Sequence, residues 1–332
     1  MELGRALFGH SSRRTATPRE RDGTVRRKRP RTCVALILVL GVVSLGLDAQ
    51  DRAWAAPPTT AGTIAFVIDG GPPNGGIYTM APTGSDLRRL TAADDYRPRW
   101  SPDGTKMVFQ RFEAGPAKSY IYVMDADGTN VVRLTTRTGF QPAWSPDGSR
   151  IVFGSGRGRK AELFVMNADG SGLTRLTYNR FEDVEPAWSS DGATIAFTSR
   201  RHGNTDIYLM AQDGSDQARL THSAAGDGNP DWSPDGTRLV FQSNRRDRNW
   251  DLYTIRPDGS GLEQLTSDPT IEATPAWSPD GRQIAFTIAR YSHDREDIAV
   301  LHLDSSVLVR FVIRDSFELE PDWQPVLSTS VT

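Results

Sequence analysis

Cysteine is almost absent from this chain of 332 residues. Its single cysteine, Cys33, lies in an apolar run near the N-terminus, so the rest of the sequence can form neither a disulfide framework nor a thiolate metal site. Histidine is also scarce, and no H-E-x-x-H or G-x-S-x-G motif occurs. A chain of this length buries a sizeable core without cross-links. The sequence therefore indicates an ordinary folded domain with few of the residues and motifs that catalytic sites use.

Positive charge is concentrated at one end of the chain. Residues 1–32 carry ten Lys and Arg against three Asp and Glu, whereas residues 56–332 carry 28 basic and 36 acidic side chains. Binding to a nucleic-acid backbone needs clustered positive charge. The acidic body therefore argues against a nucleic-acid partner.

Long hydrophobic runs are limited to one, at residues 33–47. Its 15 residues suit the core of a signal peptide and fall short of the ~20 that span a membrane. Small residues follow, and cleavage is expected after Ala55 or after Ala49. Residues 1–55 are thus interpreted as a basic region plus signal peptide, which predicts an exported protein, periplasmic or extracellular. The alternative is that residues 33–47 stay in place as a membrane anchor.

A short string beginning with tryptophan recurs through the remaining sequence. The string is W-S-P-D-G and occurs five times, with Ser190 replacing the proline once. A sixth tryptophan continues the period, so the tryptophans are spaced by 44 to 46 residues: Trp100, Trp144, Trp188, Trp232, Trp277 and Trp323. A period of this length with short strands is typical of β-propellers.

Each repeat predicts four strands, a to d. Strand a is the P-x-W segment, strand b an alternating run such as 195–197, strand c a run such as 207–210, and strand d the R-L-T ending, as in Leu220-Thr221. We interpret the aspartate of S-P-D-G as a turn residue, because successive repeats specify the same turn, and the tryptophan as a wedge between blades. The aspartates concerned are Asp103, Asp147, Asp191, Asp235 and Asp280.

The count of strands predicts how the ring closes. Strand b occurs six times from Ile64 onward, and strand a occurs six times, ending at Trp323. One set of strands b, c and d at the N-terminal end has no strand a, and one strand a at the C-terminal end has no partners. Together they complete one blade, which leaves no open edge in the ring. The expected fold is all-β: a six-bladed propeller of four-stranded antiparallel blades over residues 62–327. Residues 56–61 form a linker and residues 328–332 a tail.

The recurring strings W-S-P-D-G, I-Y-x-M, D-G-S and R-L-T resemble the WD-repeat-like propeller repeats of the TolB family. The resemblance covers roughly residues 62–326. It implies the propeller fold and an envelope compartment, since TolB itself is a periplasmic component of the Tol–Pal system. That protein has an α/β domain ahead of its propeller, which has no counterpart before Ile64 here, so the resemblance does not carry over a Tol–Pal role.

The repeats differ from one another at the residues just before the proline of strand a. In a propeller the d–a and b–c loops share one face, and these positions are strongly acidic, whereas the b–c loops are rich in arginine. The candidate binding residues at this channel mouth are Asp94, Asp95, Arg97, Gln141, Glu182, Asp183, Glu185, Asp227, Asn229, Glu272, Glu318 and Glu320. They form either surface ion pairs of little consequence or a mouth that binds a basic peptide, a partner protein or a hard cation.

We therefore expect an exported, monomeric, non-enzymatic binding or scaffold propeller whose ligand is a protein or peptide of the cell envelope. The membrane is involved only if the leader is retained. No cofactor is expected; Ca²⁺ is a minor alternative, because no D-x-D-x-D-G loop occurs. The alternative function is a carbohydrate-active or other hydrolytic or lyase enzyme, with its acids among Glu182, Asp183, Glu185, Glu272, Glu318 and Glu320.

Overall fold

The computed structural model describes residues 43–44, 62–69, 75–113, 118–156, 160–289, 296–312 and 317–325. The chain divides into two compact units, Met1–Val39 and Leu40–Thr332, and all described residues belong to the second. The expected signal peptide (apart from 43–44), the linker and the tail lie outside the described residues. Among the residues that are described, no helix is long and apolar enough to cross a membrane.

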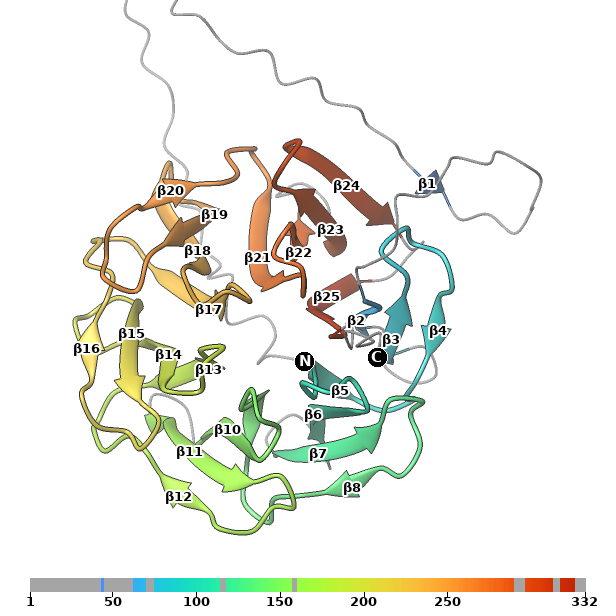
Figure 1. Cartoon of the computed structure of the whole chain (residues 1–332), viewed down its shortest axis with the longest axis vertical. Helices are drawn as coiled ribbons and strands as arrows, with labels where there is room; N and C mark the ends of the chain where they lie inside the picture. Colours follow the sequence, from blue (N-terminus) through green and yellow to red (C-terminus); the bar gives the residue numbers. More distant parts are fainter. Residues whose placement is uncertain are drawn as a thin grey trace, which may run out of the picture. The chain divides into compact units, whose positions relative to one another are not determined.

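Six sheets are arranged as the blades of a ring (Figure 1). Strand a, the innermost, is β25 (Phe317–Trp323) in blade one, then β5 (Asp95–Trp100), β9 (Phe140–Trp144), β13 (Asp183–Trp188), β17 (Asp227–Trp232) and β21 (Ile271–Trp277). Strand b is β2 (Ile64–Asp69), then β6 (Lys106–Phe112), β10 (Arg150–Ser155), β14 (Thr194–Ser199), β18 (Leu239–Arg246) and β22 (Gln283–Ala289).

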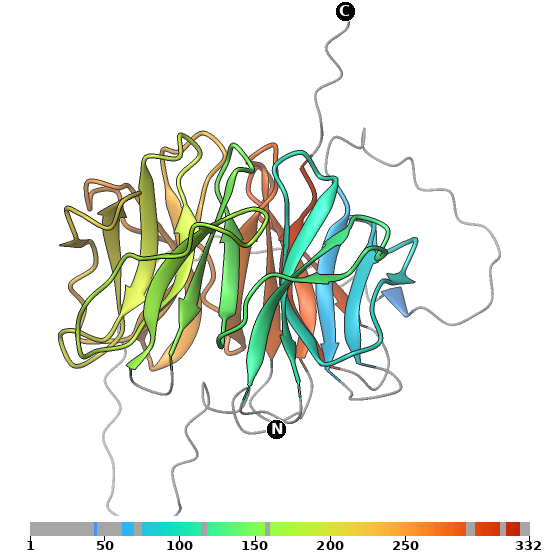
Figure 2. The same cartoon turned by 90° about the horizontal axis from the view of Figure 1, so that it is seen from below.

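The outer two strands of each blade follow in the same order. Strand c is β3 (Gly76–Met80), β7 (Ser119–Asp125), β11 (Glu162–Asn167), β15 (Asp206–Ala211), β19 (Asn249–Ile255) and β23 (Glu296–His302). Strand d is β4 (Arg88–Arg89), β8 (Val132–Arg133), β12 (Thr174–Arg175), β16 (Ala218–Arg219), β20 (Glu263–Gln264) and β24 (Val307–Val312). Figure 2 shows the strands running between two faces, which we name the hairpin face (a–b and c–d turns) and the loop face (b–c and d–a loops).

The ring closes as the sequence predicts. Blade one has the order β25-β2-β3-β4, and its antiparallel register places Ile64 opposite Trp323. The first blade is thus built from three strands near one end of the propeller and one strand from the other. The six-bladed, four-stranded antiparallel architecture is confirmed.

The core repeats from blade to blade. A fully buried phenylalanine lies at the same place in strand b of every blade: Phe66, Phe109, Phe153, Phe197, Phe241 and Phe286. Trp100 of blade two packs with Ala65 and Ile77 of blade one as well as with Met107 and Phe109 of its own blade. The tryptophan therefore acts as the predicted wedge, and each such buried aromatic contributes roughly 2–3 kcal/mol.

Two strand boundaries differ from the prediction. Strand d lies before the Leu-Thr pair, for example at Arg88–Arg89. The ladder ends there because the amide of Ile77 donates to the side-chain oxygen Thr91 Oγ1, at 3.0 Å, and not to a backbone carbonyl of strand d. Strand a begins about three residues earlier than P-x-W, at Asp95 in blade two. Several candidate residues expected in d–a loops therefore belong to strand a.

Blade six has an unusual outer edge. Its outer strand β24 has six residues, whereas the outer strand of every other blade has two. The short strand β1 (Val43–Ser44) pairs with it in parallel, opposite Phe311 and Val312. Phe311 is buried and packs into the core shared with blade one. Blade six is thus the widest sheet of the ring.

Candidate functional site

The S-P-D-G aspartates of the hairpin face are turn residues. In blade three Asp147 accepts hydrogen bonds from Ser145 Oγ at 2.6 Å and from the amide of Ser149 at 3.0 Å. The bond from Ser145 is the main reason that the pKa of Asp147 falls to about 2. The other four copies bind their own serine in the same way, which confirms the interpretation from the sequence.

The residues directly before the strand-a proline form a ring around the channel, which we name the inner ring. They all have positive φ, between 49° and 59°: Arg97, Gln141, Glu185, Asn229, Thr274 and Glu320. The strand register shifts at this point, as at a β-bulge. Such backbone is strained for a residue that precedes proline, and most strained for the β-branched Thr274.

Neighbouring side chains hold this strained backbone. The Glu320 carboxylate accepts the amide of Arg97 at 2.7 Å, Gln141 Oε1 accepts that of Glu185 at 3.1 Å, and Glu185 Oε2 accepts that of Asn229 at 2.8 Å. The other three amides donate to side chains of strand b, Gln110, Gln242 and Thr287. Each blade thus fixes the inner ring of the next.

Arg97 bridges the channel within the inner ring. Its Nε lies 2.7 Å from Glu320 of blade one, and its Nη1 donates to Asn229 Oδ1 at 2.8 Å, three blades away. Asn229 is 6% exposed, and its Nδ2 has no hydrogen-bond partner among the described residues. The polar groups of the inner ring therefore hydrogen-bond to one another across the channel, and among them Asn229 Nδ2 is a donor without a partner among the described residues.

A second charged level lies two residues further along strand a. Arg99 Nη1 is 3.4 Å from Asp322 Oδ1, and Asp231 lies close enough for Arg99 to lower its pKa. Burial is the stronger influence on both acids: it raises the pKa of Asp231 and raises that of Asp322 to about 7. The two carboxylates also accept the amides of Trp277 and Trp100, respectively.

Several of the predicted mouth acids are buried and paired. Asp95, Asp183 and Asp227 begin strand a and are at most 1% exposed. Their carboxylates bind Arg111 at 2.6 Å, Arg201 at 2.8 Å and Arg245 at 2.9 Å. Each guanidinium also lies over two aromatic rings, one from strand b and one from strand c, 4.8–5.5 Å from the ring centres.

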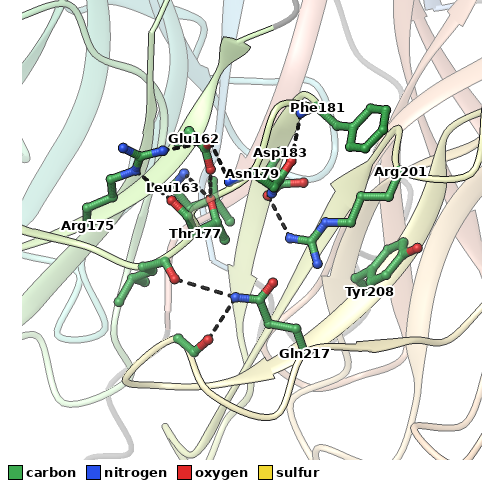
Figure 3. A network of polar contacts seen from close by, with 12 residues as sticks. Glu162, Leu163, Arg175, Thr177, Asn179, Phe181, Asp183, Arg201, Tyr208 and Gln217 are labelled. Atoms are coloured by element: carbon green, nitrogen blue, oxygen red, sulfur yellow. Dashed lines mark hydrogen bonds and ion pairs between the residues drawn. The ribbon is translucent and has the colours of Figure 1, made fainter.

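The pair in blade four belongs to a wider network that reaches blade three (Figure 3). Asn179 Nδ2 donates to Asp183 at 2.6 Å, while the Asn179 amide donates to Glu162 Oε1 at 2.9 Å. Glu162 also accepts Thr177 Oγ1 at 2.6 Å and Arg175 Nη2 at 2.8 Å. This network fixes the d–a loop that joins the two blades.

Four further candidate acids have different surroundings. Glu182 forms an exposed pair with Arg200 at 2.7 Å. Glu272 is 1% exposed, and burial raises its pKa to about 8, with the neighbouring Asp251 adding to the effect. Asp94 is exposed on the loop face. Glu318 is buried like the strand-a aspartates.

The structure therefore separates the twelve candidate residues into the inner ring, the buried acids and two more accessible acids, Asp94 and Glu182. Among the described residues, no group of three or more His, Cys, Asp or Glu is placed to hold a metal ion. Sequence reasoning missed Arg99, Asp231 and Asp322. The signal was present, because the middle residue of P-x-W is charged only in these three blades and is alanine in the others.

Solved structures of similar fold include TolB from Acinetobacter baumannii, with 21% identity over 80% of this chain and 67% of that one, at a TM-score of 0.71. A putative TolB from Agrobacterium tumefaciens has 20% identity over 80% of this chain and all of that one, at 0.63. A puromycin-hydrolysing peptidase of Mycobacterium tuberculosis shares 16% over 70% of this chain and 41% of that one, at 0.53. Such likenesses show the fold alone.

Among curated proteins no match was found. The model of the TolB β-propeller domain, in contrast, matches residues 98–229 and 224–329, which is more than half of the chain. The same repeats that predicted the ring carry this match. The chain therefore belongs to the family of TolB β-propeller domains.

Proposed function

We propose that this protein is an exported, non-enzymatic binding or scaffold module that takes a protein or peptide ligand at the loop face, around the inner ring. One observation carries the proposal: the positions at which the repeats disagree meet as a single polar ring at one end of the channel. Repeated scaffolds place recognition in such variable positions. The basic region followed by an apolar run at residues 33–47 supports export.

The candidate acids are better suited to holding the loop face than to proton transfer. Asp95, Asp183 and Asp227 are each bound to an arginine, so a substrate would have to displace a buried ion pair to reach them. What remains accessible is a fixed polar surface with the exposed acid Asp94 and the half-buried acid Glu182. A preorganised surface of this kind favours recognition of a partner.

A hydrolytic or lyase function is the second candidate, and one observation favours it. Glu272 and Asp251 are neighbouring carboxyl groups whose pKa values burial raises to about 8 and about 6. Pairs of acids with separated pKa values are common in active sites. Both residues are at most 3% exposed, however, so a substrate could reach them only after the blades part.

Affinity capture from the native cell envelope tests the proposal. The loop-face variant Asp94→Asn/Glu182→Gln/Glu185→Gln should lose partners that the wild type recovers, because it removes three carboxylate charges near the inner ring. The control Asp86→Asn/Glu263→Gln/Asp304→Asn makes the same change in charge beside the hairpin face and should keep them. Equal recovery by both variants would reject the mouth as the binding site. Robust turnover of peptides or glycans by the wild type would reject a non-enzymatic role.

A further inference from the structure

Blade three breaks the pairing that blades two, four and five share. In those blades the guanidinium over the strand-c tyrosine is neutralised by the first aspartate of strand a, as in Asp183–Arg201. In blade three the position of the aspartate is Gly139, and the residue 18 positions later, Arg157, lies outside the described residues. The guanidinium beside the strand-c ring is instead that of Arg137, from the d–a loop, 5.3 Å from the centre of the Phe164 ring. Blade three thus has an arginine from another loop over its strand-c ring and no aspartate at the start of strand a.

Packing explains why no acid can stand at that position. A Cβ atom on Gly139 would lie 2.7 Å from Ile121 Cγ1 and 3.3 Å from Phe153 Cδ2. Contacts this short need the core of blades two and three to shift. Arg137 therefore contacts the Phe164 ring, is exposed, and has no acidic partner among the described residues.

Other cations surround Arg137 at a hollow of about 410 Å³ on the loop face of blade three. Arg137, Lys160 and Arg180 line it and are exposed, and none of the three side chains forms a hydrogen bond or ion pair with another described residue. Arg180 follows Asn179, whose Oδ1 accepts the amide of Phe181 at 2.7 Å and so fixes the backbone of the loop. Three cationic side chains without an acidic partner among the described residues thus line one hollow.

Among the described residues that line the hollow, one is an acid, and it does not offset these charges. Glu162 is 5% exposed, and its carboxylate is bound by Arg175, Thr177 and the amide of Asn179 (Figure 3). The body of the protein is acidic overall, so this hollow is a local reversal of charge. A cationic surface on an acidic protein selects ligands by electrostatic complementarity.

We propose that the hollow of blade three binds an acidic segment of a protein partner, through carboxylates that pair with Arg137, Lys160 and Arg180. This inference rests on the proposed function, because it assumes a protein ligand on the loop face. Arginine guanidinium groups pair with carboxylates in bidentate geometry. Sugars bind by stacking on open aromatic faces, and the aromatic ring that lines the hollow, Phe164, is covered by Arg137. A peptide therefore fits better than an acidic saccharide.

Fluorescence anisotropy with the full chain tests the proposal. The probes are labelled peptides of eight residues, alternating Gly with Glu, Gln or Lys, and a labelled hexauronate. We expect the Glu peptide to bind best and to bind more weakly at high salt, since exposed charge pairs are screened. Arg137→Gln/Lys160→Gln/Arg180→Gln should weaken its binding about tenfold, as removing several steering and pairing charges does.

The control Arg88→Gln/Arg256→Gln/Arg282→Gln removes three exposed charges away from the hollow and should change the affinity less than about twofold. Equal affinities of the two variants, tight binding of the Gln peptide, or binding of the hexauronate in place of the Glu peptide would each overturn the proposal. The outcome is distinct from that of the envelope capture. If the proposed function fails, the envelope capture recovers no partner. If only this inference fails, the capture still recovers a partner, but the Glu peptide does not bind at the hollow.

Discussion

The two faces of the ring use aspartate in opposite ways. On the hairpin face each S-P-D-G aspartate binds within its own turn, as Asp147 binds Ser145 and Ser149, and it remains open to solvent. On the loop face Asp183 is fully buried and binds an arginine from the following loop and an asparagine from the preceding one. The first kind of aspartate shapes a turn, and the second joins segments that are distant in sequence. Their loss should therefore differ greatly in effect.

The largest effect is expected from Asp183→Ala. The change leaves Arg201, only 18% exposed in its side chain, without its carboxylate, and it frees the Asn179 side chain. Removal of one partner from a buried pair costs about 3–5 kcal/mol. Urea unfolding monitored by tryptophan fluorescence should show this loss. A loss below about 1 kcal/mol would mean that the two faces do not differ.

The next effect depends on pH and concerns Glu272 on the loop face. Its pKa is raised to about 8 in the folded protein, whereas in the unfolded chain it lies near the ordinary value of 4.5. The folded state must therefore hold a proton that the unfolded state releases, so stability should fall as pH rises from about 5 to about 8.

Glu272→Gln should flatten that pH profile and be more stable than the wild type at pH 9, by more than about 1 kcal/mol since one pKa unit is worth about that much. Thermal unfolding across the pH range measures it. A profile unchanged by the substitution would show that Glu272 does not carry the proton.

A smaller effect with the opposite pH dependence is expected on the hairpin face. The folded pKa of Asp147, about 2, lies below the ordinary 3.8, so its contribution to stability is present above about pH 4 and disappears as pH falls toward 2. Asp147→Asn should cost about 0.5–1 kcal/mol at pH 7, because hydrogen bonds in solvent are worth little. The two proteins should become equally stable near pH 2, and a difference that persisted there would contradict the charge-based explanation.

The smallest effect is expected from Glu182→Ala, the neighbour of Asp183. Its pair with Arg200 is exposed, with 47% of the arginine side chain accessible. Exposed pairs contribute about 0–1 kcal/mol. Compared with Asp183→Ala in the same unfolding experiment, this variant separates burial from charge, and equal losses would assign the effect to charge alone.

The hairpin face could be predicted from the sequence, and the loop face largely could not. Residues that bind locally repeat with the period, so the S-P-D-G turns, the strand-b phenylalanines and the ring closure could be read from one chain. The loop-face pairs could not, because the arginine lies 16 residues after its aspartate in blade two but 18 residues after it in blades four and five. The bond between Arg97 and Asn229 joins residues 132 apart and has no local pattern at all.

The closing strand also determines how the ring would respond to mechanical force. Ile64, at the start of β2, lies opposite Trp323, at the end of β25, while Asp69 lies opposite Phe317. A pull on the two ends of the propeller would therefore load the same end of this antiparallel pair. The hydrogen bonds would open one after another, as in a zipper, and would not resist together in shear. Blade one should therefore yield at low force, well before the five blades whose strands are contiguous.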